Sequence, residues 1–221
     1  MACSSLVAAY PGSGISREGI AMNRKNGAAY LAEFIGTYFM VFLGCGAIVL
    51  AERGGQVDPS MIPFALGGTV GAMIYAVGHI SGAHFNPAVT IAFWADKKLA
   101  GGLVPGYLLA QFGGAIAAST THYMLWGQEH SFGATVLSSS LAIEGSRVAK
   151  LTSGTLVEVL ISFALMFVIM AVATDRRAAG QHAGIAIGTT VALCALVMGP
   201  LTGASMNPAR SFGPALLSGN Q

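Results

Sequence analysis

Long apolar runs dominate the chain, and short polar connections separate them. A membrane helix needs about 20 mostly apolar residues. Five stretches reach that length, at residues 28–51, 61–80, 99–126, 153–174 and 183–201. Two further apolar segments, 88–94 and 209–217, are about half as long as a span and are therefore expected to re-enter the membrane without crossing it. The pattern predicts an all-α membrane protein with five full spans and two re-entrant half-helices.

The composition supports a membrane protein and argues against several other classes. Of 221 residues, 54% are hydrophobic and only 9% are charged, whereas about a quarter of a soluble chain is charged. A net charge of +2 gives no reason to expect a nucleic-acid partner. The three cysteines are scattered and suit small packing residues. Since no nucleophile–base pair, metal cluster or cofactor loop can be assembled, we expect no enzyme, metal or cofactor.

Basic residues predict which ends of the spans face the cytoplasm. Seven of them lie in the N-terminal tail, at 97–98 and at 176–177, and three lie in the intervening loops. The positive-inside rule then places the tail, residues 1–27, in the cytoplasm. Two spans and a re-entrant segment return the chain to the inside at Lys97, and the next two spans do so again at Arg176. Residues 127–152 are then an extracellular connecting loop, and the protein crosses the cell membrane several times.

An internal repeat divides the chain into two halves, 28–126 and 153–221. Asn-Pro-Ala occurs at 86–88 and again at 207–209, each time after a Gly-Ala pair at the same distance. Glu33 and Glu158 occupy matching places in the first and fourth spans. Because three spans separate the two starts, the halves enter the membrane from opposite sides. An inverted repeat of this kind places its functional site near the membrane midplane, between the halves.

The Asn-Pro pairs explain how the half-helices, expected at 86–95 and 207–217, begin. Asn is a favoured N-cap, and Pro is favoured at the first helical position. The cap uses the amide oxygen of Asn86 or Asn207, which leaves the amide NH₂ to donate elsewhere. The two positive helix ends would meet at mid-membrane beside the polar runs 81–84 and 202–205. A single Asn-Pro could cap an ordinary helix, but two copies at matching repeat positions favour a shared central site.

The sequences 81–90 and 203–214 resemble those of the aquaporin family, the major intrinsic proteins. The second motif looks most like that of the nodulin-type and related microbial members. The resemblance implies an aquaporin-like helical bundle, a homotetramer with one pore per protomer, and passage of water and small neutral solutes. It places four residues at the pore centre and five along the pore lining. The centre is formed by Asn86, Asn207, Ala88 and Ala209, and the lining by His84, Gly82, Ala83, Gly203 and Ser205.

Arg210 is a charge within membrane-type sequence, and such charges usually face a cavity. By resemblance it belongs to a narrow outer filter, together with Leu66, Ala195 and Ala204. Water-selective members usually carry an aromatic residue at the position of Leu66 and a histidine at the position of Ala195. The aliphatic residues of this chain imply a wider, less polar constriction. Ser211 stands where glycerol facilitators typically have an acidic residue, so we expect water plus small uncharged solutes such as glycerol, ammonia or neutral metalloid acids.

Two roles are open for Glu33 and Glu158. They could form a proton relay, which would suit a proton-coupled secondary transporter, or each could accept backbone N–H groups of a re-entrant loop. Their positions follow the repeat, which favours the loop-bracing role.

The family has a sixth span, whereas this sequence stops at Gln221, soon after the second half-helix. We therefore expect the chain to be a C-terminal truncation of a longer gene product. A stop codon directly after Gln221 in the open reading frame would contradict this. A truncated form that conducts nothing is a further alternative.

Overall fold

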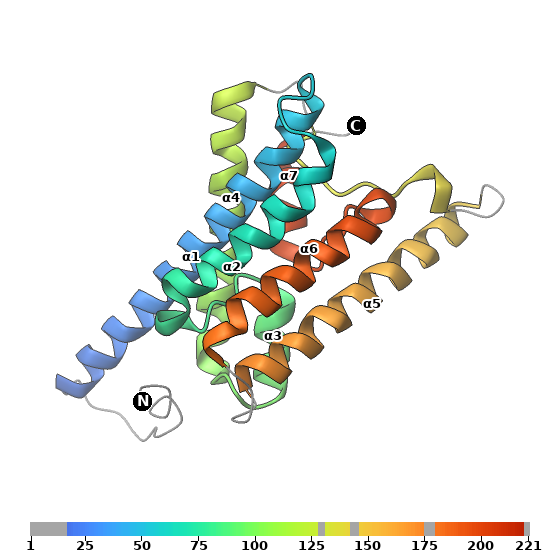
Figure 1. The fold of residues 1–221 in the computed structure, drawn as a ribbon. Helices are drawn as coiled ribbons and strands as arrows, with labels where there is room; N and C mark the ends of the chain where they lie inside the picture. The colour runs from blue at the N-terminus through green and yellow to red at the C-terminus, as the bar shows by residue number, and fades with distance from the viewer. Residues whose placement is uncertain (1–16, 128–130, 142–145, 175–179, 219–221) are drawn as a thin grey trace.

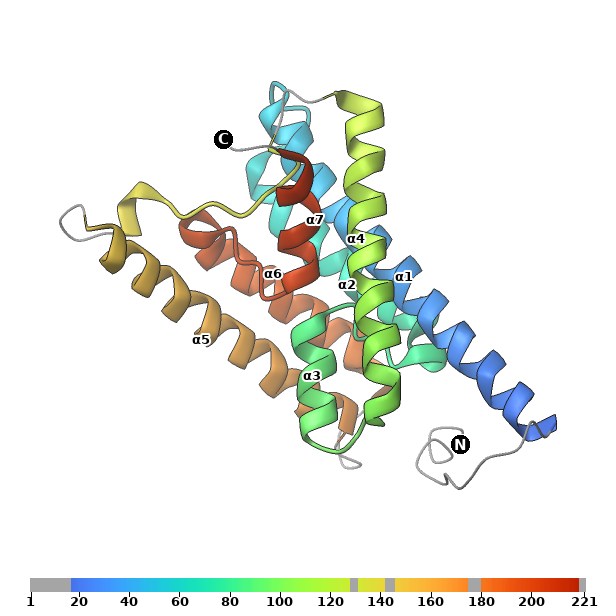
Figure 2. The same cartoon turned by 180° about the vertical axis from the view of Figure 1, so that it is seen from behind.

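The computed structural model describes residues 17–127, 131–141, 146–174 and 180–218, except for the side chains of residues 17–24 and 180. These described residues form seven α-helices, which are connected by loops and short 3₁₀ turns (Figures 1 and 2). They are α1 Arg17–Glu52, α2 Ile62–Ser81, α3 Pro87–Ala95, α4 Val104–Trp126, α5 Arg147–Thr174, α6 Ala183–Thr202 and α7 Pro208–Ser218. Within the described residues, five helical stretches are long and apolar enough to cross a membrane. The predicted all-α membrane fold with five spans is confirmed.

Local capping sets the ends of α2 and α6. Before α2, the Asp58 carboxylate accepts hydrogen bonds from the Ser60 backbone N–H at 2.8 Å and the Ser60 hydroxyl at 2.7 Å. These bonds lower the pKa of the Asp58 carboxyl, which lies outside the spans. At their C-terminal ends, α2 and α6 stop at Gly82 and Gly203, whose φ angles of 87° and 80° are left-handed. Glycine adopts this conformation without steric cost, so each helix ends directly before this glycine, where the loop begins.

Helices α2 and α6 join the two repeats through glycines. A Cβ atom added to Gly188 would lie 2.5 Å from the Gly67 carbonyl oxygen, and one added to Gly71 would lie 2.9 Å from the Gly184 carbonyl oxygen. Each helix therefore presents two glycines four residues apart to the other. This spacing lets membrane helices approach until their backbones touch. The crossing leaves no room for a larger side chain at these positions.

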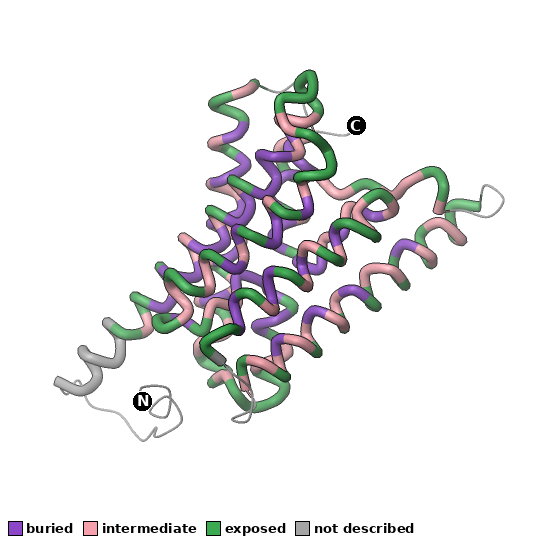
Figure 3. The backbone as a smooth tube through the Cα atoms, viewed as in Figure 1, coloured by how far each residue is buried: buried purple, intermediate pink, exposed green. Residues whose placement is uncertain are grey.

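A second group of helices, α1, α4 and α7, surrounds a tightly packed core. Cβ atoms on Gly114 and Gly213 would clash with the backbone of Phe34 and of Ala115 respectively, so α4 lies directly against α1 and α7. Figure 3 shows buried residues concentrated in the middle of these helices. Helix α5 packs along α6 at the flank of the molecule, and mainly one narrow face of it is buried.

The half-helices α3 and α7 lie roughly in line, one in each half of the molecule (Figure 2). Each packs on α4, and the two also contact one another. They begin at Pro87 and Pro208, directly after Asn86 and Asn207. The ends that carry the Asn-Pro pairs therefore meet in the interior, where the two preceding loops also meet.

Candidate functional site

The two loops before the half-helices have the same backbone conformation. We call residues 82–86 the first loop and residues 203–207 the second loop. A positive φ recurs at three matching positions in each, namely Gly82, Ala83 and Phe85, then Gly203, Ala204 and Met206. For residues other than glycine, this left-handed conformation costs about 1–2 kcal/mol each. Hydrogen bonds from the surrounding helices must therefore hold both loops in place.

Glu33 of α1 holds the first loop. Its Oε1 accepts hydrogen bonds from the Ser81 hydroxyl at 2.6 Å and from the His84 backbone N–H at 2.9 Å. Its Oε2 accepts from the Phe85 backbone N–H at 2.7 Å and from the Gln111 side-chain amide of α4 at 2.7 Å. Each carboxyl oxygen of Glu33 therefore accepts from two donors.

Glu158 of α5 holds the second loop in the same way. Its Oε1 accepts hydrogen bonds from the Thr202 hydroxyl at 2.7 Å and the Ser205 backbone N–H at 3.0 Å, and its Oε2 accepts from the Met206 backbone N–H at 2.9 Å. The two glutamates thus bond equivalent atoms of the two repeats. This geometry is that of a brace for loop backbone, one of the two roles that the sequence left open.

The side-chain oxygen of each Asn caps the half-helix that follows it. Asn86 Oδ1 accepts from the Ala88 backbone N–H at 2.9 Å. Asn207 Oδ1 accepts from the backbone N–H groups of Ala209 at 3.0 Å and of Arg210 at 3.3 Å. The caps fix both amide planes, so the NH₂ groups of the two side chains have set directions.

The sequence predicts that the NH₂ groups donate outside their own half-helices, and in the structure each donates to a carbonyl of the opposite loop. Asn86 Nδ2 donates to the Met206 carbonyl at 2.7 Å, and Asn207 Nδ2 donates to the Phe85 carbonyl at 2.8 Å. Each amide therefore ties its own loop to the opposite loop. Since an amide nitrogen carries two hydrogens, one N–H of each Asn is left over. Among the described residues, that of Asn207 has only the Met40 sulfur as a further partner, at 3.6 Å, and a thioether is a weak acceptor.

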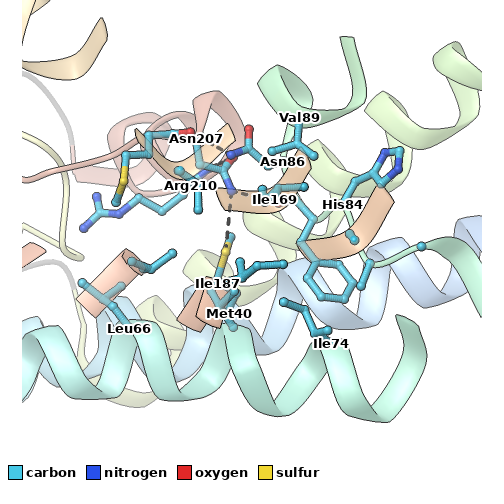
Figure 4. Close-up of a pocket in the computed structure, with 18 of the residues that line it drawn as sticks. Met40, Leu66, Ile74, His84, Asn86, Val89, Ile169, Ile187, Asn207 and Arg210 are labelled. Carbon is cyan, nitrogen blue, oxygen red and sulfur yellow. Dashed lines mark hydrogen bonds between the residues drawn. The ribbon is translucent and has the colours of Figure 1, made fainter. Parts of the chain in front are cut away.

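A cavity of about 100 Å³ adjoins the two Asn residues. Its wall combines apolar side chains of α2, α5 and α6 with both loops. In Figure 4, Arg210 and His84 lie toward opposite ends, and the Asn pair lies between them. Nine residues that the sequence singled out line this cavity: Leu66, Gly82, Ala83, His84, Asn86, Ala204, Ser205, Asn207 and Arg210.

Four of the expected pore residues do not line the cavity. Ala88 is exposed on the first turn of α3. Ala209 is fully buried in a cluster with Met40 and Ala115, because the first turn of α7 carries it to the face that packs on α4. Ala195 is buried in the cluster that contains Leu66 and Ala204. Gly203 lies behind the wall, where an added Cβ would meet Thr135.

Arg210 is buried, with 3% of its surface exposed. Its Nη1 donates to the Gly133 carbonyl at 2.8 Å, so the loop 131–141 holds the guanidinium in place. Within the described part of the chain, no carboxylate lies within ion-pair distance of Arg210. A buried positive charge therefore remains at one end of the cavity.

Sequence reasoning missed several residues that support this site. Gln111 was detectable, because a lone amide in an apolar span usually has a structural or functional partner. Tyr107 of α4 donates its hydroxyl to the Ser81 carbonyl at 2.6 Å. Gly133 and Thr135 lie in a loop whose sequence gives no sign that it reaches the interior.

Comparisons with known proteins agree with this geometry. The family model described as major intrinsic protein matches residues 21–221. Aquaporin NIP1-1 from Zea mays is 47% identical over 190 residues, which cover 86% of this chain and 64% of the relative. Aquaporin NIP3-1 from Arabidopsis thaliana is 45% identical over 190 residues, covering 86% of this chain and 58% of the relative. The chain thus spans less than two thirds of the length of these relatives.

A solved structure is also similar. The X-ray structure of the aquaglyceroporin from Plasmodium falciparum matches with a TM-score of 0.72 and 26% identity. The match covers 87% of this chain and 81% of that chain. The family match over most of the chain, the similar relatives and the paired Asn-capped half-helices lead to one conclusion: this multi-pass membrane protein belongs to the major intrinsic protein family, the aquaporins.

Proposed function

We propose that the protein is a passive transmembrane channel for water and small uncharged solutes. The observation that carries this proposal is the Asn pair, whose capped and cross-linked amides keep one N–H each for the cavity between Arg210 and His84. A cavity needs only about 10–15 Å³ to hold one water. This cavity of roughly 100 Å³ therefore accommodates several water molecules.

The same geometry supports exclusion of protons and cations. A water at the Asn pair would accept from both remaining N–H groups, so its oxygen would point at Asn86 and Asn207. Such a water cannot accept a proton from a neighbour, which interrupts proton transfer along the file. The positive ends of α3 and α7 meet at this point, and Arg210 adds a full charge. Each of these repels cations.

The cavity wall supports a solute range wider than water alone. The cavity wall also contains the small Ala204 and the aliphatic Leu66, and Leu66 lies on the same side of the Asn pair as Arg210 (Figure 4). Neither adds a polar group that would compete with the hydroxyls of a solute. The name aquaglyceroporin belongs to the Plasmodium falciparum protein, and we extend glycerol passage to this chain only as part of the proposal.

We also propose that the channel is a homotetramer with a cytoplasmic N-terminus in the cell membrane. The distribution of lysine and arginine between the loops supports the orientation. Large apolar side chains such as Phe163 and Phe167 are exposed along α5, as expected of surfaces that face lipid or a neighbouring protomer.

Stopped-flow light scattering of proteoliposomes tests the proposal. In an osmotic gradient of an impermeant solute, vesicles that contain the protein should shrink faster than empty vesicles. In a separate gradient of glycerol, they should first shrink and then re-swell as glycerol enters. Uptake that saturates and requires a proton gradient would instead identify a secondary transporter. Vesicles indistinguishable from empty ones would refute conduction by this chain.

A further inference from the structure

A chain of buried polar groups runs from α1 to the cavity on the side of the Asn pair away from Arg210. Gln111 Nε2 of α4 donates both to Glu33 Oε2 at 2.7 Å and to the Thr90 hydroxyl oxygen of α3 at 2.8 Å. The Thr90 hydroxyl oxygen lies 3.1 Å from Nδ1 of His84. Glu33, Thr90 and Gln111 are fully buried, so water cannot replace a missing partner in this chain.

The proton positions follow from the ends of this chain. Both Glu33 oxygens accept backbone N–H groups, and Oε2 also accepts from Gln111 Nε2, so the Gln111 side chain presents its NH₂ group to Glu33. The second amide hydrogen of Gln111 then points to Thr90. A hydroxyl that accepts this hydrogen still has its own to donate, and His84 Nδ1 is the acceptor beside it. Nδ1 therefore carries no hydrogen, and in the neutral ring the hydrogen is on Nε2.

His84 lines the cavity, and Nε2 is the ring nitrogen that does not contact Thr90. A Cβ atom added to Gly82, another cavity-lining residue, would lie 3.5 Å from Nε2, and the described residues offer Nε2 no hydrogen-bond partner. The ring is held flat against Phe93, with centroids 4.6 Å apart and planes 11° apart. Its orientation is therefore fixed by stacking on one face and by Thr90 at one edge.

We propose that Thr90 is a positioning residue that fixes His84 as the Nε2–H tautomer, so that this half of the pore presents a constant N–H donor. This inference rests on the proposed channel function. A fixed donor favours solutes that bring an acceptor oxygen, which includes water and polyols. Gln111 and Glu33 act behind Thr90, and Glu33 thereby links the position of the first loop to the tautomer of His84.

The second repeat has the same arrangement with different chemistry. Ser205 and Ser211 occupy the positions of His84 and Thr90, and their hydroxyl oxygens are 2.5 Å apart. Behind Ser211 lies Thr135 at 3.0 Å, in the place that Gln111 takes in the first repeat. Ser205 also donates to the Asn207 carbonyl at 2.8 Å. In both repeats, therefore, the residue four positions after the Asn contacts the cavity-lining residue two positions before the same Asn.

Nitrogen-15 NMR of the full chain in lipid bilayers, with labelled histidine, tests the proposal. The His84 signals are assigned by their loss in His84→Asn. In the unaltered protein near neutral pH, His84 should show a protonated Nε2 and an unprotonated Nδ1. Thr90→Val removes the hydroxyl at nearly constant volume. It should lower the ratio of Nε2–H to Nδ1–H tautomer by roughly threefold to tenfold, the worth of one hydrogen bond, and Thr90→Ser should restore it.

Thr69→Val is the matched control, because within the described part of the chain the buried Thr69 hydroxyl of α2 bonds only the Ala65 carbonyl of its own helix. It should leave the His84 signals unchanged. A protonated Nδ1 in the unaltered protein, or a Thr90→Val spectrum identical to it, would overturn the proposal. If Thr90→Val does not fold, the tautomer of the unaltered protein and of Thr90→Ser decides the question. The signals do not depend on transport, so failure of conduction in proteoliposomes would be recognised separately.

Discussion

Replacing Glu158 with glutamine tests whether this carboxylate braces the second loop. The Glu158 oxygens accept from three donors, the Thr202 hydroxyl and the backbone N–H groups of Ser205 and Met206. A glutamine keeps the shape of the side chain but has only one acceptor oxygen. If that oxygen takes the place of Oε1, the new NH₂ group faces the Met206 N–H, and two donors oppose each other.

The cost follows from the number of bonds lost. Leaving one buried donor without an acceptor costs about 1–3 kcal/mol. For a chain of about this size, each kcal/mol corresponds to about 2–4 °C in unfolding temperature. Glu158→Gln should therefore lower the unfolding temperature by roughly 2–12 °C. Glu158→Ala leaves the backbone N–H groups of Ser205 and Met206 without an acceptor, whereas the Thr202 hydroxyl can rotate to another one. Its loss of unfolding free energy should therefore be about twice that of Glu158→Gln.

Thermal unfolding of the purified protein in detergent, followed by intrinsic fluorescence, measures this loss. Asp96→Asn is the matched control, because Asp96 pairs with Lys98 at the surface, and such pairs contribute little to stability. An unfolding temperature of Glu158→Gln equal to that of the unaltered protein would refute the bracing role. If the same variant also lost uptake that depends on a proton gradient, Glu158 would be part of a proton relay.

Three other substitutions test separate parts of the account. Arg210→Ala should widen the solute range and weaken charge exclusion while water flow persists in stopped-flow assays; lost water flow with an unchanged solute range would make Arg210 structural. Asn207→Asp keeps the cap oxygen but removes the donor to Phe85, so it should reduce water permeability, and unaltered permeability would show that the amide hydrogens are dispensable. Gly188→Ala should lower the unfolding temperature by an amount equivalent to about 1–3 kcal/mol, because its Cβ would lie 2.5 Å from the Gly67 carbonyl oxygen. Gly68→Ala, whose Cβ meets nothing within 4 Å, should not, and equal losses in the two variants would contradict the backbone contact between α2 and α6.

The sequence was sufficient for the spans and the starts of the half-helices, because these depend on local physics. Apolar length determines what can cross a membrane, and Asn followed by Pro begins a helix wherever the chain folds. The repeat also identified Glu33 and Glu158 as equivalent, and they bond equivalent loop atoms in the structure.

The links between distant segments could not be read in the same way. Asn86 and Asn207 donate to the carbonyls of Met206 and Phe85, and a backbone carbonyl is present at every residue, so no residue type indicates the acceptor. The burial of Ala209 against α4 likewise depends on which face of α7 turns inward. The reach of the loop 131–141 to Arg210 depends on tertiary packing alone.

Water permeability of proteoliposomes as a function of temperature distinguishes a pore from diffusion through the bilayer. A passive pore gives osmotic shrinkage faster than that of empty vesicles, with an activation energy lower than that of the bare bilayer and no dependence on a proton gradient. An activation energy equal to that of empty vesicles, or transport that stops when the proton gradient is removed, would contradict a passive pore through the Asn pair.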